Sequence, residues 1–373
     1  MLKLPSELLA MVIEAPTSKS DQFSLCTNLR QTCRAIEGNS RHDFLKKWCS
    51  QRTITFAQTS IDRLQSELFC VMATHITSLT FNSESLCGYT SDGEFSGCPQ
   101  DVFDLVANSN WKKTLEDISP QLVNLREITI LSPDSLSGDK WDHDGYEMNG
   151  RARMSDVWTV AVSQVLLGLS PKLDDIASLR IATSLQRANN FWPMFLPVSK
   201  ARSIFDNKSG YKSLTALHVG IELGRACQVS GNTIAAGCNR ISTLRCLSLH
   251  VVIDMDSSDN NSAYYMAEVA SSDHVKFCDC VLSGLQALRL QYLSLNGFKT
   301  TSTLPKLLSS SASLRHLEIM EQGVGDKVQW GITLAEMRRL CYLQCLTLDR
   351  IHSTILGFGD YTKKWEVVFG DHD

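Results

Sequence analysis

A short apolar phrase recurs along the chain from residue 76 onward. Each copy has an apolar residue, two intervening residues, a second apolar residue, one intervening residue and a third apolar residue. The eight copies are Ile76/Leu79/Phe81, Leu125/Ile128/Ile130, Ile176/Leu179/Ile181, Leu214/Leu217/Val219, Leu244/Leu247/Leu249, Leu290/Leu293/Leu295, Leu314/Leu317/Ile319 and Leu343/Leu346/Leu348. The last two apolar residues of a copy are two apart, so they point to the same side of a strand. Each copy therefore predicts one short strand with a buried face.

The distances between the copies indicate a repeating strand–helix unit. The shortest steps between middle apolar residues are 24, 29 and 30 residues, close to the leucine-rich-repeat period of about 20–29 residues. The longer steps leave room for inserted helices, and apolar residues three and four apart predict helices within 101–118 and 155–169. We expect an α/β fold, in which an irregular leucine-rich-repeat solenoid forms a curved parallel sheet backed by helices. Because leucine fills 47 of 373 positions, chance matches make an unrelated α/β fold the alternative.

The first 50 residues follow a helical pattern instead. Leu4, Leu8 and Ile13 fall on one face at helical spacing. Pro5 and Glu7 suit the first turn of a helix, where a missing amide costs nothing and the helix dipole favours an acid. Three short helices cannot bury a core alone, so they need the rest of the chain or a partner. We divide the chain into a helical motif at 1–50, a linker or connecting helix at 51–75 and the repeat domain at 76–373.

The N-terminal segment resembles the F-box, the helical motif that tethers substrate receptors to cullin–RING ubiquitin ligases. The resemblance is carried by Leu4-Pro5-x-Glu7-Leu8-Leu9 with Ile13, then by Leu25, then by Leu29-Arg30-x-Thr32-Cys33-Arg34. The later part resembles the degenerate leucine-rich repeats that often follow an F-box, notably in fungal proteins. It implies a substrate receptor of an SCF-type ligase that performs no chemistry itself and needs no cofactor. The adaptor-binding residues it implies are Leu4, Pro5, Glu7, Leu8, Ile13, Leu25, Leu29 and Cys33. The implied partners are the SCF adaptor subunit, through it a cullin, and a protein substrate.

Two other interpretations stay open. The N-terminal helices can instead pack on the first repeat as the cap that a solenoid requires, in a free-standing interaction protein. An enzyme with a site assembled from distant residues is the third hypothesis, although the sequence has no GxSxG elbow and no HExxH pair.

Composition and charge narrow the function further. The chain has 36 basic and 40 acidic residues, a net charge of −4, which disfavours nucleic acid as a partner. No apolar run approaches the roughly 20 residues of a membrane span. The 13 cysteines form no CxxC pair, a pattern typical of reduced thiols. We therefore expect a cytoplasmic or nuclear protein.

Substrate recognition is expected on the concave side of the sheet. The residues beside and between the last two apolar residues of each phrase point away from the helices. The five best candidates in this set are Arg180, His218, Tyr292, His316 and Glu318, because Arg and Tyr are common interface hot spots and the mixed polarity suits a protein surface. The alternative is that these residues are only the solvated face of the sheet.

No metal site is expected. The acidic stretch at 138–150 resembles part of a calcium loop, but Lys140 and Arg151 stand where carboxylate ligands are needed. Cys278 and Cys280 with His274 lack the second ligand pair of a structural zinc site.

Overall fold

The structure of the chain is a computed structural model. It describes residues 45–86, 88–89, 95–97, 99–132, 154–181, 196–197, 211–223, 227–253, 263–286, 288–298, 302–320, 323–324, 327–340, 342–349, 352–353 and 365–368, and four isolated positions at 20, 24, 27 and 28. The eight residues of the F-box-like motif and the acidic stretch at 138–150 lie outside the described residues.

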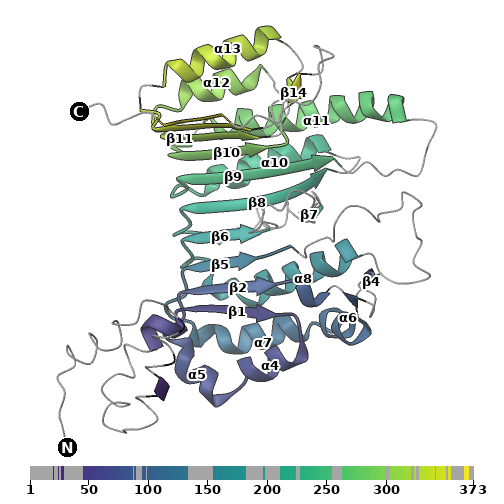
Figure 1. The fold of residues 1–373 in the computed structure, drawn as a ribbon, viewed down its shortest axis with the longest axis vertical. Coiled ribbons are helices and arrows are strands. Elements are labelled where there is room, and N and C mark those ends of the chain that lie inside the picture. The colour runs from purple at the N-terminus through teal and green to yellow at the C-terminus, as the bar shows by residue number, and fades with distance from the viewer. Residues whose placement is uncertain are drawn as a thin grey trace, which may run out of the picture.

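Nine strands of one large sheet pair in parallel, in the order in which they occur along the chain. They are β1 (Gln51–Thr55), β2 (Ser78–Asn82), β5 (Glu127–Ile130), β6 (Ser178–Ile181), β8 (Ala216–Leu223), β9 (Cys246–Ile253), β10 (Tyr292–Asn296), β11 (His316–Met320) and β13 (Cys345–Asp349). Figure 1 shows these strands stacked along the longest axis of the molecule. The expected α/β fold with a parallel sheet is confirmed.

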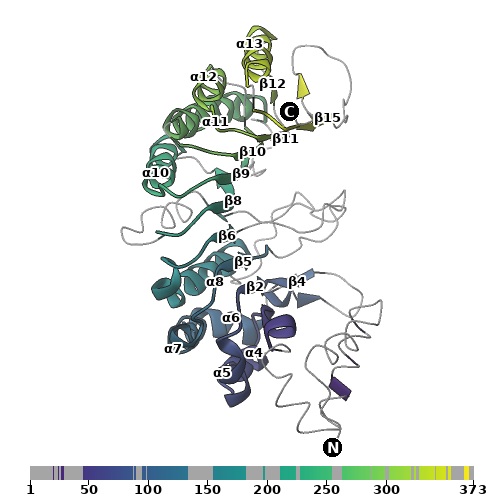
Figure 2. The same ribbon diagram turned by 90° about the vertical axis from the view of Figure 1, so that its left-hand side faces the viewer.

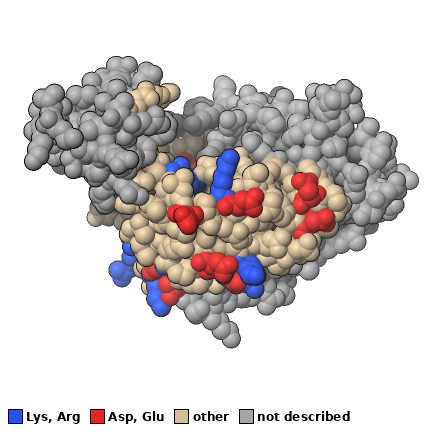
Figure 3. Space-filling view, turned by 90° about the horizontal axis from the view of Figure 1, so that it is seen from below, with Lys and Arg blue, Asp and Glu red and all other residues tan. Residues whose placement is uncertain are grey.

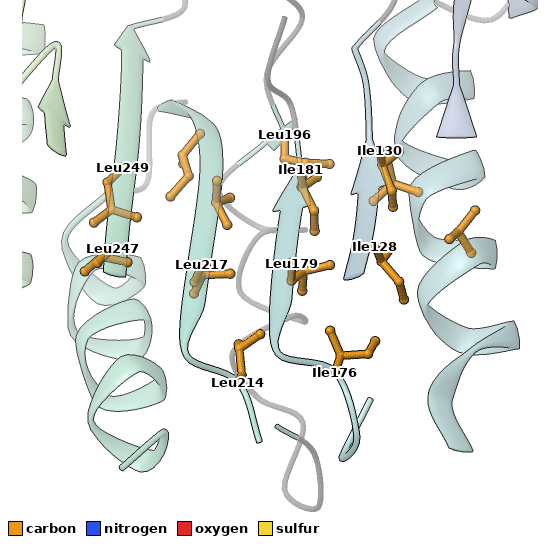
Figure 4. Packing of buried hydrophobic residues seen from close by; sticks show 14 of the residues in the cluster. Ile128, Ile130, Ile176, Leu179, Ile181, Leu196, Leu214, Leu217, Leu247 and Leu249 are labelled. Atoms are coloured by element: carbon orange, nitrogen blue, oxygen red, sulfur yellow. The ribbon is translucent and has the colours of Figure 1, made fainter. Parts of the chain in front are cut away.

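The sheet has one register throughout. The middle apolar residues of all eight phrases are paired across neighbouring strands, in the ladder Leu79–Ile128–Leu179–Leu217–Leu247–Leu293–Leu317–Leu346. Figure 4 shows part of this ladder, with the apolar side chains of β5, β6, β8 and β9 lying in rows across the sheet. A single buried cluster runs from Ile54 to Leu343, so β1 and the eight phrases share one hydrophobic core.

Helices cover the side of the sheet to which these apolar residues point. They are α4 (Gln58–Leu64), α5 (Glu67–Ala73), α6 (Gln100–Ala107), α7 (Asn110–Ile118), α8 (Met154–Gly168), α10 (Cys227–Arg240), α11 (Ala263–Leu285), α12 (Thr303–Ser310) and α13 (Lys327–Arg338). Figure 2 shows the sheet edge on, bending so that α7, α8 and α10 to α12 lie on its outer side. We call the opposite side the inner face.

The helix predicted within 155–169 is α8, whereas the stretch predicted as helical within 101–118 forms two helices. The break between α6 and α7 is at Ser109, whose φ of 59° is left-handed. A left-handed residue cannot continue a right-handed helix, and the periodic pattern of apolar residues does not reveal such a break.

In several turns that lead into a strand, the side chain directly before the first apolar residue of the phrase donates a hydrogen bond to the preceding repeat unit. The hydroxyl of Thr243 donates to the carbonyl of Leu214 at 2.7 Å, and that of Ser313 donates to the carbonyl of Leu290 at 2.9 Å. The side-chain amide of Asn124 donates to the carbonyl of Thr74 at 2.6 Å. These bonds satisfy carbonyl groups that have left the helices and have not entered the sheet.

Residues 51–75, expected to be a linker or a connecting helix, form a strand–helix unit of the sheet. β1 pairs with β2 in the common register, and Arg52 lies opposite Leu79. Its guanidinium donates to the Sγ atom of Cys49 at 2.9 Å, while Ile54 holds the next apolar position. The apolar phrase did not predict β1, because Arg52 stands where the phrase requires its middle apolar residue.

Shorter strands lie at the edges of the described structure. β15 (Trp365–Val368) pairs antiparallel with β13 and ends the sheet, and β7 (Leu196–Pro197) pairs with the last residues of β8. Two further pairs are β3 (Gly88–Tyr89) with β4 (Phe95–Gly97), and β12 (Gly323–Val324) with β14 (His352–Ser353). None of these short strands contains the repeated phrase.

Substitution of Gly297 tests the close approach of β9 and β10. Gly297 has a φ of +71°, and a Cβ atom there would overlap the carbonyl oxygen of Val251. We expect Gly297→Ala to lower the free energy of unfolding by more than about 2 kcal/mol, measured by urea denaturation followed by circular dichroism.

The matched control is Gly331→Ala in α13, where an added Cβ meets nothing within 4 Å. There the alanine should raise the free energy of unfolding by about 0.5–1 kcal/mol, because it favours the helix. Equal effects of the two substitutions would contradict the packing described at Gly297.

Candidate functional site

The common register of the strands arranges the inner-face side chains in straight rows. We call the residues directly before the middle apolar positions the Tyr292 row: Ser78, Glu127, Ser178, Ala216, Cys246, Tyr292, His316 and Cys345. We call the residues directly after them the Arg180 row: Thr80, Thr129, Arg180, His218, Ser248, Ser294, Glu318 and Thr347. Neighbours within a row are about 4.8 Å apart, the spacing of strands in a sheet.

The five candidate residues lie together near the middle of these rows. Arg180 on β6 is the cross-strand neighbour of His218 on β8. Tyr292 on β10 is the neighbour of His316 on β11, and Glu318 stands two residues beyond His316 on the same face. Residues separated by up to 138 positions in sequence thus form one continuous patch, which we call the inner-face cluster.

Tyr292 interacts with three other members of this cluster. Its hydroxyl donates to Oε2 of Glu318 at 2.7 Å. The centre of its ring lies 6.4 Å from the ring centre of His316 and 6.4 Å from that of His218. The contact with His218 crosses β9, which contributes only the small side chains of Cys246 and Ser248 to this part of the inner face. The bond to Glu318 orients Tyr292, whose ring lies between those of the two histidines.

The charges of the cluster are separated. Arg180 is exposed at the β6 end, and the partly buried carboxylate of Glu318 lies at the β11 end. Burial lowers the pKa of His218 to about 4, with a further lowering by Arg180 and a smaller opposing effect from Glu318. The imidazole between the two charges is therefore neutral at neutral pH. The cluster offers a cation at one end, the neutral ring of His218 beside it and an anion at the other end.

Two residues of β10 add buried polar groups that the sequence analysis did not select. Ser294 and Asn296 are 1% and 9% exposed. Asn296 lies next to the Arg180 row on the same face, and its Oδ1 atom has no hydrogen-bond partner in the part of the chain that the structure describes. An unpaired buried acceptor of this kind lowers the stability of the fold. The only sequence signal for Asn296 is its place directly after the last leucine of a phrase.

One nucleophile beside the cluster, the thiol of Cys246, is disfavoured by its surroundings. Cys246 lies on β9 opposite Ala216 and diagonal to His218, and burial raises the pKa of its thiol. The thiolate, which is the reactive form, is thereby disfavoured. Within the described ranges, no group of three or more His, Cys, Asp or Glu side chains could hold a metal ion. Cys278 is buried in α11 and Cys280 is partly exposed there.

Titration of His218 tests the electrostatics of the cluster. In Arg180→Gln the pKa of His218 should rise above about 4, and in Glu318→Gln it should fall, because each substitution removes one charge acting on the imidazole. Both shifts can be read from NMR spectra of the protein with labelled histidine, with His218→Gln to assign the signal. A pKa of His218 that is unchanged in Arg180→Gln would contradict the placement of Arg180 beside it.

The same titration has a consequence for stability. The unfolded chain binds a proton at His218 near pH 6.5, while the folded protein does so only near pH 4. The free energy of unfolding should therefore fall as the pH drops from 6.5 towards 4. His218→Gln should lose this part of the pH dependence in thermal unfolding.

Comparison with known proteins adds no family to this description. No protein-family model matches the chain, and no curated protein matches its sequence. A function for the inner-face cluster is therefore argued from its geometry and from the motifs quoted above.

Proposed function

We propose that the protein is a substrate-receptor subunit of an SCF-type cullin–RING ubiquitin ligase. The F-box-like motif binds the adaptor subunit, and the inner face of the leucine-rich-repeat-like sheet binds a protein substrate. The protein itself catalyses nothing. It holds a substrate lysine near the ubiquitin-loaded enzyme and so raises its effective concentration.

The repeating register is the observation that carries this proposal. Eight phrases, three of whose seven steps are close to the leucine-rich-repeat period, follow an F-box-like motif. Their middle residues pair strand by strand without a shift. An α/β fold that is not built from repeats does not require the same position of a repeated phrase to be paired in every strand. The regular register therefore supports a solenoid, and a solenoid behind an F-box is an architecture of substrate receptors.

The unit formed by β1, α4 and α5 supports adaptor binding over capping. It already covers β2, the first strand with the full apolar phrase. Its own strand has Arg52 in place of the middle apolar residue, as suits the polar end of a repeat array. Since this unit forms a first layer of its own among the described residues, it supports a role for the F-box-like motif in binding a partner.

One observation favours the free-standing interaction protein as the second candidate. Helix α5, at the same end of the sheet, exposes Leu68 and Val71, which are 67% and 42% exposed. Figure 3 looks at this end of the molecule and shows acidic and basic side chains interspersed among uncharged ones. The N-terminal segment or another protein could bury the two apolar side chains.

No helix among the described residues is long and apolar enough to cross a membrane. The proposed compartments are the cytoplasm and the nucleus, where the ligase acts.

Co-expression with the ligase adaptor tests the proposal. The wild-type protein should retain the adaptor in a pulldown, and Pro5→Ala/Leu8→Ala should lose it, because these substitutions remove part of the apolar surface that docks. Arg180→Gln, on the inner face, is the matched control and should retain the adaptor. Assembly that survives the double substitution would show that the docking residues are wrong.

A deletion separates the two candidates. Removal of residues 1–44 leaves the chain from Leu45, whose side chain is buried, onward. If the segment docks on an adaptor, the shortened protein should lose the adaptor and keep its unfolding temperature. If the segment is a cap, the unfolding temperature should fall, because the first layer of the sheet would lose the segment that stabilises it.

A further inference from the structure

We infer that the inner-face cluster recognises an extended peptide segment with one acidic and one basic side chain about five or six residues apart. The acidic side chain binds at Arg180 and the basic one at Glu318, and the segment runs across the strands. The inference rests on the proposed function in one respect, namely that the inner face is where the substrate binds.

The spacing follows from the register of the sheet. Arg180 and Glu318 occupy the same row, on β6 and β11, with β8, β9 and β10 between them. Four strand spacings of about 4.8 Å separate their Cα atoms by roughly 19 Å. An extended peptide advances about 3.3 Å per residue, so five or six residues cover this distance.

The extended form is the shorter of the two regular conformations that can join the two charges. An extended segment needs five or six residues, whereas a helix would need about 13 residues to span the same 19 Å at 1.5 Å per residue.

The two charged residues of the cluster, Arg180 and Glu318, differ in how firmly neighbouring side chains hold them in place. Glu318 is oriented by the 2.7 Å bond from Tyr292, so a basic side chain meets a carboxylate that is already placed. Arg180 is exposed and is bounded by the neutral ring of His218, so an acidic side chain meets a single cation. The rings of His218, Tyr292 and His316 lie between them as a surface for the intervening residues.

Selection from a random peptide library displayed on phage tests the inference with the full-length protein. The wild type should enrich peptides in which an acid and a base stand five or six residues apart. The charge-exchanged variant Arg180→Glu/Glu318→Arg should enrich the same spacing with acid and base interchanged. The control Lys306→Glu/Asp117→Arg makes the same two changes at exposed helix positions and should enrich the wild-type set.

Affinities of the best enriched peptide give the second measurement. In fluorescence anisotropy, Arg180→Gln and Glu318→Gln should each weaken binding about tenfold or more, the effect of losing one charge-assisted hydrogen bond. Tyr292→Phe should weaken it less, because Glu318 is present but no longer held. If the charge-exchanged variant Arg180→Glu/Glu318→Arg fails to fold, these single variants test the inference in its place.

Several outcomes would overturn the inference. These are enrichment of peptides without a charge pair, a charge pair whose order does not follow the exchanged residues, a spacing near 13 residues, or no enrichment by a protein that unfolds like the wild type. The adaptor pulldown is independent of this result. Peptide binding without adaptor binding would support the inference and contradict the proposed role in a ligase. Adaptor binding without peptide enrichment would support the role in a ligase and contradict the inference.

Discussion

The whole molecule depends on one constraint, the common register of its parallel strands. Shifting a strand by one residue would turn its buried apolar residues to the inner face and its polar residues into the core. The ladder from Leu79 to Leu346 prevents this, because its members from Leu79 to Leu317 are buried against the helices and Leu346 is partly buried there. Burying one leucine or isoleucine stabilises the fold by about 1.5–3 kcal/mol, so a slipped strand would lose several kcal/mol. Helices of different number and length can therefore be inserted between strands without disturbing the sheet.

The same register creates the inner-face cluster. Since the side chains alternate, a buried ladder on one side produces polar rows on the other. Arg180, His218, Tyr292, His316 and Glu318 are neighbours only because their strands are aligned to the residue. The small residues of β9 then let the rings of His218 and Tyr292 meet across it. The burial that lowers the pKa of His218 is likewise a property of the assembled face, and it leaves a neutral imidazole beside Arg180.

The two edge strands of the sheet differ in sequence and pairing from the strands in its middle. A repeat array has to stop without leaving a wholly apolar edge. At one end β1 keeps the register but replaces the middle apolar residue with Arg52, whose guanidinium is bonded to the sulfur of Cys49. At the other end β15 reverses direction and pairs antiparallel with β13. Neither strand carries the repeated phrase, because an edge strand has one neighbour fewer to pack against, and neither was predicted from the sequence.

The sequence by itself determined the class of fold, the eight phrase-bearing strands and the side of each strand that is buried, because these follow from local spacing of apolar residues. It also singled out the five residues of the inner-face cluster as members of one face. Only the tertiary structure decided that Tyr292 donates a hydrogen bond to Glu318, that β1 in 51–75 belongs to the sheet and that Oδ1 of Asn296 finds no partner among the described residues. These features depend on which strands are neighbours and on what their side chains leave uncovered. A linear pattern contains the period of the repeats but not the contacts between residues that are 26 or more positions apart.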